Sequence, residues 1–326
     1  MKMLGCFKYS RLPIIFFAIT VLFSVIKLNT ASCAEATEMK GGYRMMVGDF
    51  EVIALSDGIN QRSVEQQSQL LQGNREKIKD VLERAYPGGQ MESTVNAFLI
   101  NTGSKLVLVD TGYGKMGSPT MGNVIDNLRT VGYQPEQIDE IYLTHMHGDH
   151  IGGLVLGTER VFANATVYAN KSEADYWLDD GNRNTAPDAA QQTFQAAKEK
   201  ITPYVTAGKF KTFEGNIQLT PGIRAEALFG HTPGHTAYVI ESKGNTLVLW
   251  GDIIHVAAVQ FEDPSITIAY DSDKEEAAKV RQQILVEAVK NNWLIGGAHI
   301  AFPGIGHVQA NGGQYSFVPL NFQAEK

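Results

Sequence analysis

The stretch H-M-H-G-D-H at residues 145–150 places three of the chain's eight histidines and one aspartate within six positions. Neutral imidazole and carboxylate are the ligands that borderline divalent metals such as zinc prefer in proteins. Gly148 permits a tight turn, so that the first two histidines can converge on one metal while Asp149 and His150 face a second. We therefore predict a metal site with hydrolytic chemistry. The alternative interpretation is a polar loop that carries surface histidines.

Three later residues of the same chemical types follow predicted strands or turns. His235 comes after the Pro-Gly turn of G-H-T-P-G-H-T at 230–236, Asp252 follows an apolar strand, and His299 follows another. Loops at strand ends are where a rigid scaffold usually displays chemical groups. An aspartate that shares its two oxygens between two metals would complete a dinuclear pair, and water between two divalent cations is deprotonated near neutral pH.

With these residues in place, the chain resembles the metallo-β-lactamase superfamily over nearly its whole length after residue 34. The resemblance rests on the hexapeptide, on L-V-L-V-D-T-G at 106–112, and on the order of the later single residues. It implies an α+β fold, a four-layer αβ/βα sandwich with the metals at one edge. It implies seven ligands: His145, His147 and His235 for one metal, Asp149, His150 and His299 for the other, and Asp252 as the bridge. Asp110 would orient one of the ligands from outside.

Longer segments narrow the resemblance to methyl parathion hydrolases and their lactonase relatives. They are residues 230–236, W-G-D-I-I-H-V-A-A-V-Q-F at 250–261, and G-A-H-I-A-F-P-G-I-G-H-V at 297–308. The implied protein is a hydrolase of lactones, aryl esters or phosphotriesters that uses a metal-bridging hydroxide. Its cofactors would be two divalent ions, zinc first, although manganese, cobalt and iron accept the same ligands. Asp149, Asp252 and His255 are the residues expected to take part in catalysis.

His255 departs from the pattern of the N-acyl-homoserine lactonases, which place a tyrosine three residues after the bridging aspartate. It either gives a hydrogen bond or proton to the substrate or is a buried histidine bonded to backbone. His231 and His307 lie in Gly/Pro turns, where an imidazole can satisfy loop carbonyls, and we expect both to be structural.

Residues 1–34 have the layout of a secretory signal peptide. A basic start precedes the 15-residue apolar run Leu12–Ile26, which is shorter than the ~20 residues that span a bilayer. Small residues then lead to Ala34, after which cleavage is expected. The alternatives are a retained membrane anchor and lipidation of Cys33. We expect a periplasmic or secreted protein with a single hydrolase domain at 35–326.

Charge and cysteine content limit the classes of partner. Both cysteines, Cys6 and Cys33, lie in the leader, so a metal site would be built without thiolates. The leader holds four of the 28 basic residues and no acidic ones, which leaves 24 basic against 35 acidic side chains. This negative balance disfavours nucleic acid and anionic membranes. We expect a small, neutral, ester-like substrate and no membrane span after leader removal. Assembly into a homodimer is left as an open alternative.

Alternating apolar runs and amphipathic stretches predict two batches of strands, each followed by helices, and hence two facing sheets with helices outside. Among the helices, Ser172–Leu178 and Gln191–Val205 carry Trp177 and Phe194. By family analogy these two aromatic side chains line an apolar pocket; otherwise they belong to the core. The segment Val64–Tyr86 has helical periodicity and is interpreted as a lid, a dimer contact or a solvated surface helix.

Three other functions compete with the lactonase-like hydrolase. A β-lactamase would share the export signal, but β-lactamases with an all-histidine site usually lack an aspartate at the position of Asp252. A glyoxalase-II-like thioesterase would share the ligands, but the leader and the negative charge disfavour its anionic intracellular substrate. A non-catalytic metal-binding protein would have lost ligands, whereas all seven expected ones are present.

Overall fold

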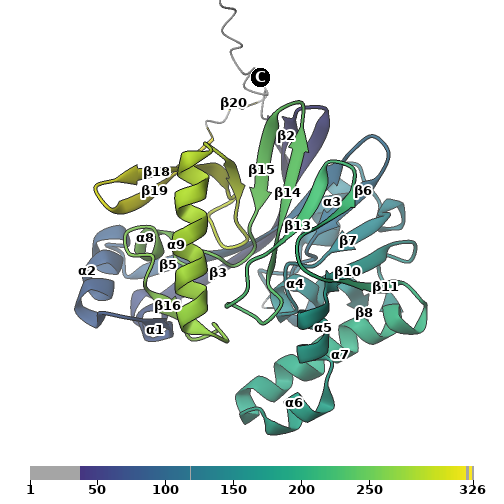
Figure 1. Cartoon of the computed structure of the whole chain (residues 1–326), viewed down its shortest axis with the longest axis horizontal. Coiled ribbons are helices and arrows are strands. Elements are labelled where there is room, and N and C mark those ends of the chain that lie inside the picture. The colour runs from purple at the N-terminus through teal and green to yellow at the C-terminus, as the bar shows by residue number, and fades with distance from the viewer. Residues whose placement is uncertain (1–36, 118, 321–322, 325–326) are drawn as a thin grey trace, which may run out of the picture. The chain divides into compact units, whose positions relative to one another are not determined.

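The computed structural model describes residues 37–117, 119–320 and 323–324, within the unit that runs from Ala34 to Lys326 (Figure 1). The predicted leader at 1–34, with both cysteines, lies outside the described residues. No helix in these ranges is long and apolar enough to cross a membrane.

Two large sheets and two short strand pairs are found in the described residues. The first sheet contains, in spatial order, β11 (Phe210–Phe213), β10 (Thr166–Asn170), β7 (Glu140–Tyr142), β6 (Leu106–Val109), β5 (Gln90–Asn101), β3 (Phe50–Ser63), β2 (Gly42–Val47), β1 (Thr37–Met39) and β20 (Gln323–Ala324). The second contains β12 (Ile217–Thr220), β13 (Ile223–Ala227), β14 (Thr236–Ser242), β15 (Asn245–Leu249), β17 (Leu294–Gly296), β18 (Ile305–Asn311) and β19 (Gln314–Pro319). The short pairs are β4 (Leu71–Gln72) with β16 (Thr267–Ile268), and β8 (Val155–Leu156) with β9 (Glu159–Arg160).

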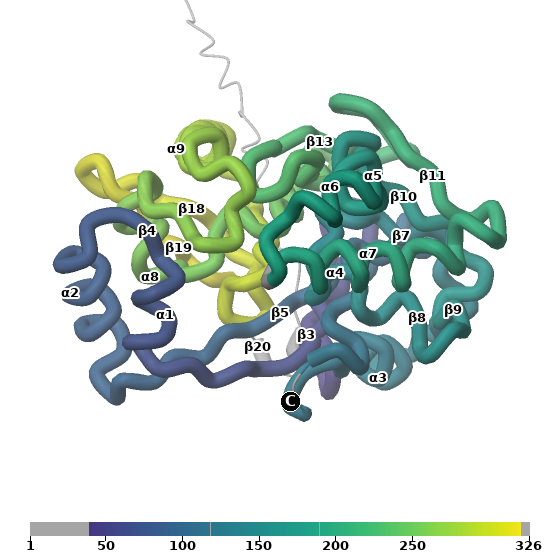
Figure 2. The backbone as a smooth tube through the Cα atoms, turned by 90° about the horizontal axis from the view of Figure 1, so that it is seen from below, coloured from purple at the N-terminus to yellow at the C-terminus, as the bar shows by residue number. Residues whose placement is uncertain are grey.

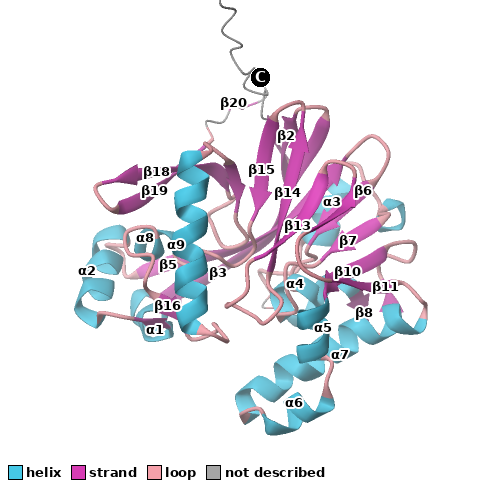
Figure 3. Ribbon diagram, in the orientation of Figure 1, coloured by secondary structure: helices cyan, strands magenta, loops and turns pink. Residues whose placement is uncertain are grey.

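Helices flank the sheets on both outer faces (Figure 3). They are α1 (Val64–Leu70), α2 (Arg75–Ala85), α3 (Val124–Thr130), α4 (Gly148–Ile151), α5 (Lys171–Trp177), α6 (Asp180–Thr185), α7 (Asp188–Thr206), α8 (Ala257–Gln260) and α9 (Lys274–Lys290). Three 3₁₀ turns complete the set: η1 (Gly114–Met116), η2 (Pro135–Gln137) and η3 (Gly152–Leu154).

The four-layer arrangement follows from the alternation of side chains along each strand. On β3, Val52 packs between the two sheets with Tyr238 of β14, whereas the next residue, Ile53, faces the helices α3, α5 and α7. On β14, Val239 points the other way from Tyr238 and packs against α9. Because successive side chains of a strand lie on opposite faces, each sheet contributes one face to the central core and one to a helix layer. The predicted αβ/βα sandwich is confirmed.

The segment Val64–Tyr86 is not one helix, in contrast to its helical periodicity. It forms α1, the short strand β4 and α2, which lie together beside α8 (Figure 2). Ile78 and Leu82 of α2 pack in one buried cluster with Val256 and Val259, just after His255. The segment is therefore not a single solvated helix, because it buries its apolar side chains against the loop that follows β15, while its polar side chains stay exposed.

Helix α3 begins at Val124, just after a loop whose backbone is bound by Asp57. Asp57 is fully buried, and its carboxylate accepts hydrogen bonds from the N–H groups of Tyr113 (3.0 Å), Gly122 (3.1 Å) and Val124 (3.3 Å). Burial raises the pKa of Asp57, and these hydrogen bonds act in the opposite direction. The loop between Tyr113 and Val124 is thus held by one carboxylate on β3.

We expect Asp57→Ala to lower the free energy of unfolding by about 3 kcal/mol, because three buried N–H groups lose a charged acceptor. Denaturant titration of the purified protein measures this change. Asp126→Ala, which removes an exposed carboxylate from α3, is the matched control and should change stability by less than about 0.5 kcal/mol. Equal effects of the two substitutions would contradict this account of the loop.

Candidate metal centre

The hexapeptide lies just beyond the end of β7, where the chain turns into α4. His145 and His150 are fully buried, and Asp149 and His150 belong to the single turn of α4. The carbonyl of His150 accepts hydrogen bonds from the backbone N–H (2.7 Å) and the hydroxyl (2.9 Å) of Thr111. This turn therefore presents its histidines from a fixed backbone.

One group of side chains brings together His145, His147, His231 and Asp252, each offering one ligand atom within 4.8 Å of the others. His147 Nδ1 lies 3.0 Å from His145 Nε2 and 3.1 Å from His231 Nε2. Oδ2 of Asp252 lies 3.3 Å from His231 Nε2 and 3.6 Å from His145 Nε2. Three imidazoles and a carboxylate thus point at one small volume.

A second group contains Asp149, His150 and His299. Asp149 Oδ2 lies 3.4 Å from His299 Nε2 and 3.7 Å from His150 Nε2. Asp252 also reaches this group, with Oδ1 3.2 Å from His150 Nε2 and Oδ2 3.1 Å from His299 Nε2. The Asp252 carboxylate therefore lies between the two groups.

The outer nitrogens of four histidines are bound by neighbouring groups, which leaves each Nε2 for the centre. His150 Nδ1 lies 2.8 Å from Asp110, as the resemblance implied for that carboxylate, and His231 Nδ1 lies 2.8 Å from Asp271. The other two outer contacts are His145 Nδ1 with the Thr144 hydroxyl (3.0 Å) and His299 Nδ1 with the Thr94 carbonyl (2.9 Å). Such outer partners fix the tautomer and the ring orientation of metal-binding histidines.

Burial and charge act in opposite directions on these imidazoles. Burial lowers the pKa of His145 and His147 well below the ordinary histidine value, so both present neutral nitrogen lone pairs. Burial also acts to lower the pKa of His150, but the charges of Asp252, Asp149 and Asp110 outweigh it and raise the pKa well above that value. The centre therefore concentrates negative charge beside buried imidazoles, which is the environment that binds a cation.

The expectation that His235 is a ligand and His231 is structural is reversed by the geometry. Both ring nitrogens of His235 are bound by backbone: Nδ1 donates to the Leu228 carbonyl (3.0 Å), and Nε2 accepts the N–H of Asp252 (3.0 Å). His235 directly precedes β14, whereas His231 lies in the loop ahead of it and reaches the centre. His235 holds Asp252 in place and does not itself face the cluster.

Glu173 of α5 joins the two histidine loops and was missed by the sequence analysis. It is 1% exposed and accepts hydrogen bonds from the backbone of Met146 (2.8 Å) and Gly234 (2.8 Å) and from the hydroxyl of Thr232 (2.7 Å). Burial raises the pKa of Glu173, and these hydrogen bonds oppose the rise. A lone glutamate in a helix carries no sequence signal for this role.

The ring of His255 has no backbone hydrogen-bond partner among the described residues, so the interpretation as a histidine bonded to backbone is not supported. Its Nε2 lies 3.1 Å from Asp252 Oδ2, and its ring stacks on His299 with centroids 5.1 Å apart. Burial lowers its pKa to about 4, against the opposing charge of Asp252. His307, in contrast, lies on β18 with Nδ1 3.0 Å from the Trp293 carbonyl, as expected of a structural histidine.

A cavity of about 710 Å³ opens onto the centre. His147, Asp149, Asp252, His255 and His299 form part of its lining. Trp177 and Phe194 line it as well, with ring centroids 4.6 Å apart, and both are also members of the buried core cluster beside α7. Trp177 and Phe194 therefore line the cavity and also belong to the core, which were the two alternatives offered by the sequence.

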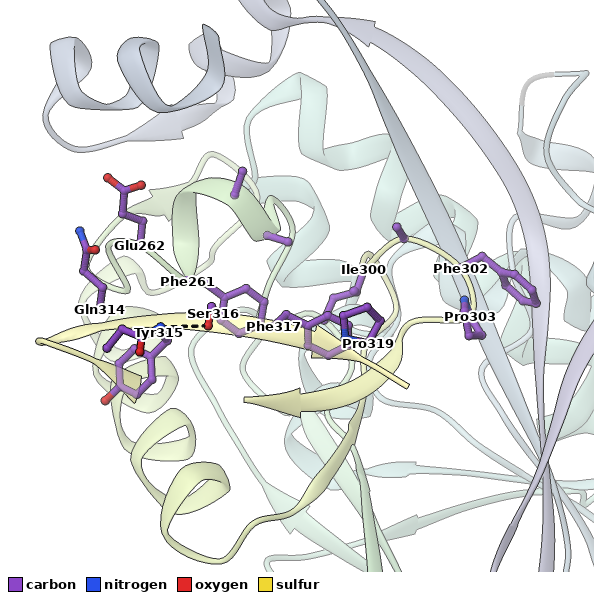
Figure 4. A pocket seen from close by; sticks show the side chains of 14 residues that line it. Phe261, Glu262, Ile300, Phe302, Pro303, Gln314, Tyr315, Ser316, Phe317 and Pro319 are labelled. Carbon is purple, nitrogen blue, oxygen red and sulfur yellow. Dashed lines mark hydrogen bonds between the residues drawn. The ribbon is translucent and has the colours of Figure 1, made fainter. Parts of the chain in front are cut away.

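A second cavity, of about 580 Å³, lies between α8, the 300–303 loop and the β18–β19 hairpin (Figure 4). Phe261, Ile300 and Phe317 contribute apolar walls, and its described lining contains no histidine, aspartate, lysine or arginine. It shares no lining residue with the first cavity. Of these two cavities, the one that contains candidate metal ligands is therefore the one that opens onto the histidines.

Comparison with known proteins agrees with this geometry. Residues 91–299 match the metallo-beta-lactamase superfamily, and the chain belongs to that family. It is 27% identical over 206 residues to an N-acyl homoserine lactonase of Bacillus cereus, which covers 57% of this chain and 74% of the relative.

Two solved structures resemble the whole fold. The hydrolase AbOPH of the beta-lactamase superfamily is 35% identical, with a TM-score of 0.80 over 88% of this chain and 99% of its own. AidC, a dizinc quorum-quenching lactonase solved with the product N-hexanoyl-L-homoserine, is 26% identical, with a TM-score of 0.79 over 87% of this chain and 98% of its own. The chain is thus a metal-dependent hydrolase, as the sequence predicted.

The exchange of roles between the two histidines of the 230–236 loop can be tested by metal content. We expect His231→Ala to lose about one equivalent of bound metal, because its Nε2 faces the cluster. His235→Asn should retain more metal than His231→Ala and lose mainly stability, because its ring contacts backbone. Mass spectrometry of the purified variants after zinc loading measures the content. Loss of metal from the His235 variant alone would restore the original ligand assignment.

Proposed function

We propose that this chain hydrolyses small lactones and related esters at a centre that holds two divalent cations. The observation that carries the proposal is the position of Asp252, whose Oδ1 faces His150 at 3.2 Å while its Oδ2 faces His231 at 3.3 Å. One carboxylate thereby belongs to both groups of candidate ligands. Lactonases among the relatives support the substrate class.

The residues of the two groups fit divalent cations because they are imidazoles and carboxylates, and because some of their buried atoms have no hydrogen-bond partner among the described residues. His150 Nε2 and Asp252 Oδ1 are buried and have no hydrogen-bond partner among the described residues. A buried carboxylate is stable only when it is paired or bound to a metal. We infer that His145, His147 and His231 hold one cation, that Asp149, His150 and His299 hold the other, and that Asp252 joins them.

Zinc is the first candidate, because the similar lactonase AidC is described as a dizinc enzyme. Manganese, cobalt and iron accept the same nitrogen and oxygen ligands. When bound, such a pair supplies a hydroxide at neutral pH and polarises a carbonyl or phosphoryl oxygen.

The chain's own residues then position the substrate and exclude water. Trp177 lies against the centre, with its ring 5.3 Å from that of His147, and with Phe194 it forms an aromatic wall suited to an acyl or aryl group. The Nε2 of His255 lies 3.1 Å from Asp252 Oδ2, where the ring can give a hydrogen bond to the leaving oxygen. We further propose that the mature enzyme acts outside the cytoplasm, because residues 1–34 have the layout of an export signal.

The substrate class is tested by one panel on metal-reconstituted protein. We expect kcat/KM to be highest for an aryl lactone or an acyl-homoserine lactone, lower for a phosphotriester, and lowest for a β-lactam. Chelation should abolish turnover and added zinc should restore it, because the buried carboxylates require the cation. A β-lactam rate above the others would overturn the proposal, and a phosphotriester rate above the lactones would reverse the ranking of esters.

We expect His255→Phe to lower kcat by about 100-fold, the size of effect typical of a positioned hydrogen-bond donor to a developing negative charge. Phenylalanine keeps the ring that stacks on His299, so both cations should stay bound. Steady-state kinetics with metal analysis separates the two effects. Unchanged kcat with full metal content would assign His255 to packing.

A further inference from the structure

Arg62 is the one lysine or arginine among the described residues that line the cavity of the metal centre. It lies near the end of β3, beyond a register shift between Ser56 and Gly58. Asn60, two residues earlier, also lines the cavity, as expected for side chains at alternate positions of a strand. The cavity therefore has a polar wall on β3 as well as the aromatic wall of α5 and α7.

The guanidinium of Arg62 has no acidic partner. Its Nη1 donates to the hydroxyl of Tyr270 at 3.2 Å, and no carboxylate of the described chain lies within 4.0 Å of it. Other arginines do pair with acids: Arg84 with Glu262, for example, at 2.7 Å. Arg75, Arg160 and Arg183 also have no carboxylate partner among the described residues. What distinguishes Arg62 from them is its place in the lining of the cavity.

The Arg62 side chain lines the cavity together with Tyr113 and Tyr270. Its charge acts on Tyr113, whose pKa is raised first by the charge of Asp149 and by burial, while Arg62 opposes that rise. Tyr270 is 44% exposed, so the Arg62–Tyr270 pair stands toward the solvent side of the cavity, away from the fully buried His145. Tyr270 also lies near His255, with ring centroids 6.5 Å apart, so a substrate whose ester lies at the histidines could extend an arm toward this pair.

We propose that Arg62 and Tyr270 form a subsite for an anionic group, such as a carboxylate, on the arm of the substrate remote from the scissile ester. A guanidinium matches a carboxylate through paired N–H donors, and Tyr270 holds one of its nitrogens in place. The inference rests on the proposed function and refines it: the reacting ester is neutral, and the remote arm carries the charge. A plain alternative is that Arg62 offsets the charges of Asp149 and Asp252 from a distance, which would affect all substrates alike.

The test compares two lactones that differ only at the remote end of the acyl arm, one with a carboxylate and one with a carboxamide of the same length. For the metal-reconstituted wild type, we expect the KM of the carboxylate compound to be about tenfold lower, the size of one partly exposed charge-assisted contact. Arg62→Gln should bring the ratio of the two KM values close to one. Arg62→Lys should keep part of the preference, because the charge stays and the paired geometry is lost.

Arg75→Gln is the matched control, because it removes the same charge from an exposed position on α2 outside the cavity. It should keep the wild-type preference. Tyr270→Phe should reduce the preference without abolishing it, since Arg62 loses its anchor and keeps its charge. Added salt should weaken the preference in the wild type, as expected for a partly exposed ion pair.

Equal KM values for the two lactones in the wild type would overturn the subsite, as would a preference that survives in Arg62→Gln. An equal loss on both compounds in that variant would assign Arg62 to the long-range role and overturn it too. If neither lactone is hydrolysed, the proposed function fails, and calorimetric binding of the same two compounds still decides the subsite. There, a carboxylate preference that Arg62→Gln removes supports the proposal, and equal affinities overturn it.

Discussion

A buried carboxylate surrounded by imidazoles is the constraint on which the rest of the structure depends. Asp252 is 2% exposed, and its oxygens lie within 4.0 Å of nitrogens of five histidines: His145, His150, His231, His255 and His299. A charge placed so deeply in protein is destabilising by several kcal/mol unless opposite charge or a metal compensates it. The fold must therefore bring loops from both sheets to one point, and hold them there.

Buried ionic contacts hold those loops. Asp271 binds the outer nitrogen of His231 and lies 3.7 Å from Arg281 of α9, whose guanidinium also donates to the carbonyls of Ile253 (2.7 Å) and Ile266 (2.9 Å). Each of these groups is buried and would be unstable alone. Because each satisfies another, a helix on the outer face of the second sheet helps to fix a histidine at the centre. Glu173 acts in the same way from a helix that covers the first sheet.

The sequence predicted the layers and most of the centre because both follow local rules. Strand alternation sorts side chains such as Val52 and Ile53 onto opposite faces, and the hexapeptide can be recognised by residue type and spacing alone. The choice between His231 and His235 could not be made in this way. Both belong to one seven-residue stretch, and only the path of the turn decides which ring meets backbone and which meets the carboxylates.

The residues that line the cavity beside the metal centre were also hard to predict, because the path of the chain decides which side chains reach it. β3 continues to Ser63 and carries Arg62 to the cavity, and no motif in the sequence indicates that this strand end lines a cavity. The candidate metal ligands come from short segments whose geometry is fixed by buried ionic contacts. The cavity walls, in contrast, come from the strand end of β3 and from helices that also pack the core. Among the described residues, the Arg62 side chain has one hydrogen-bond partner, the Tyr270 hydroxyl, so it can change without disturbing the network around Asp252. Under the proposed function, substrate preference and metal binding would be supported by different parts of the fold, so that one could vary while the other is kept.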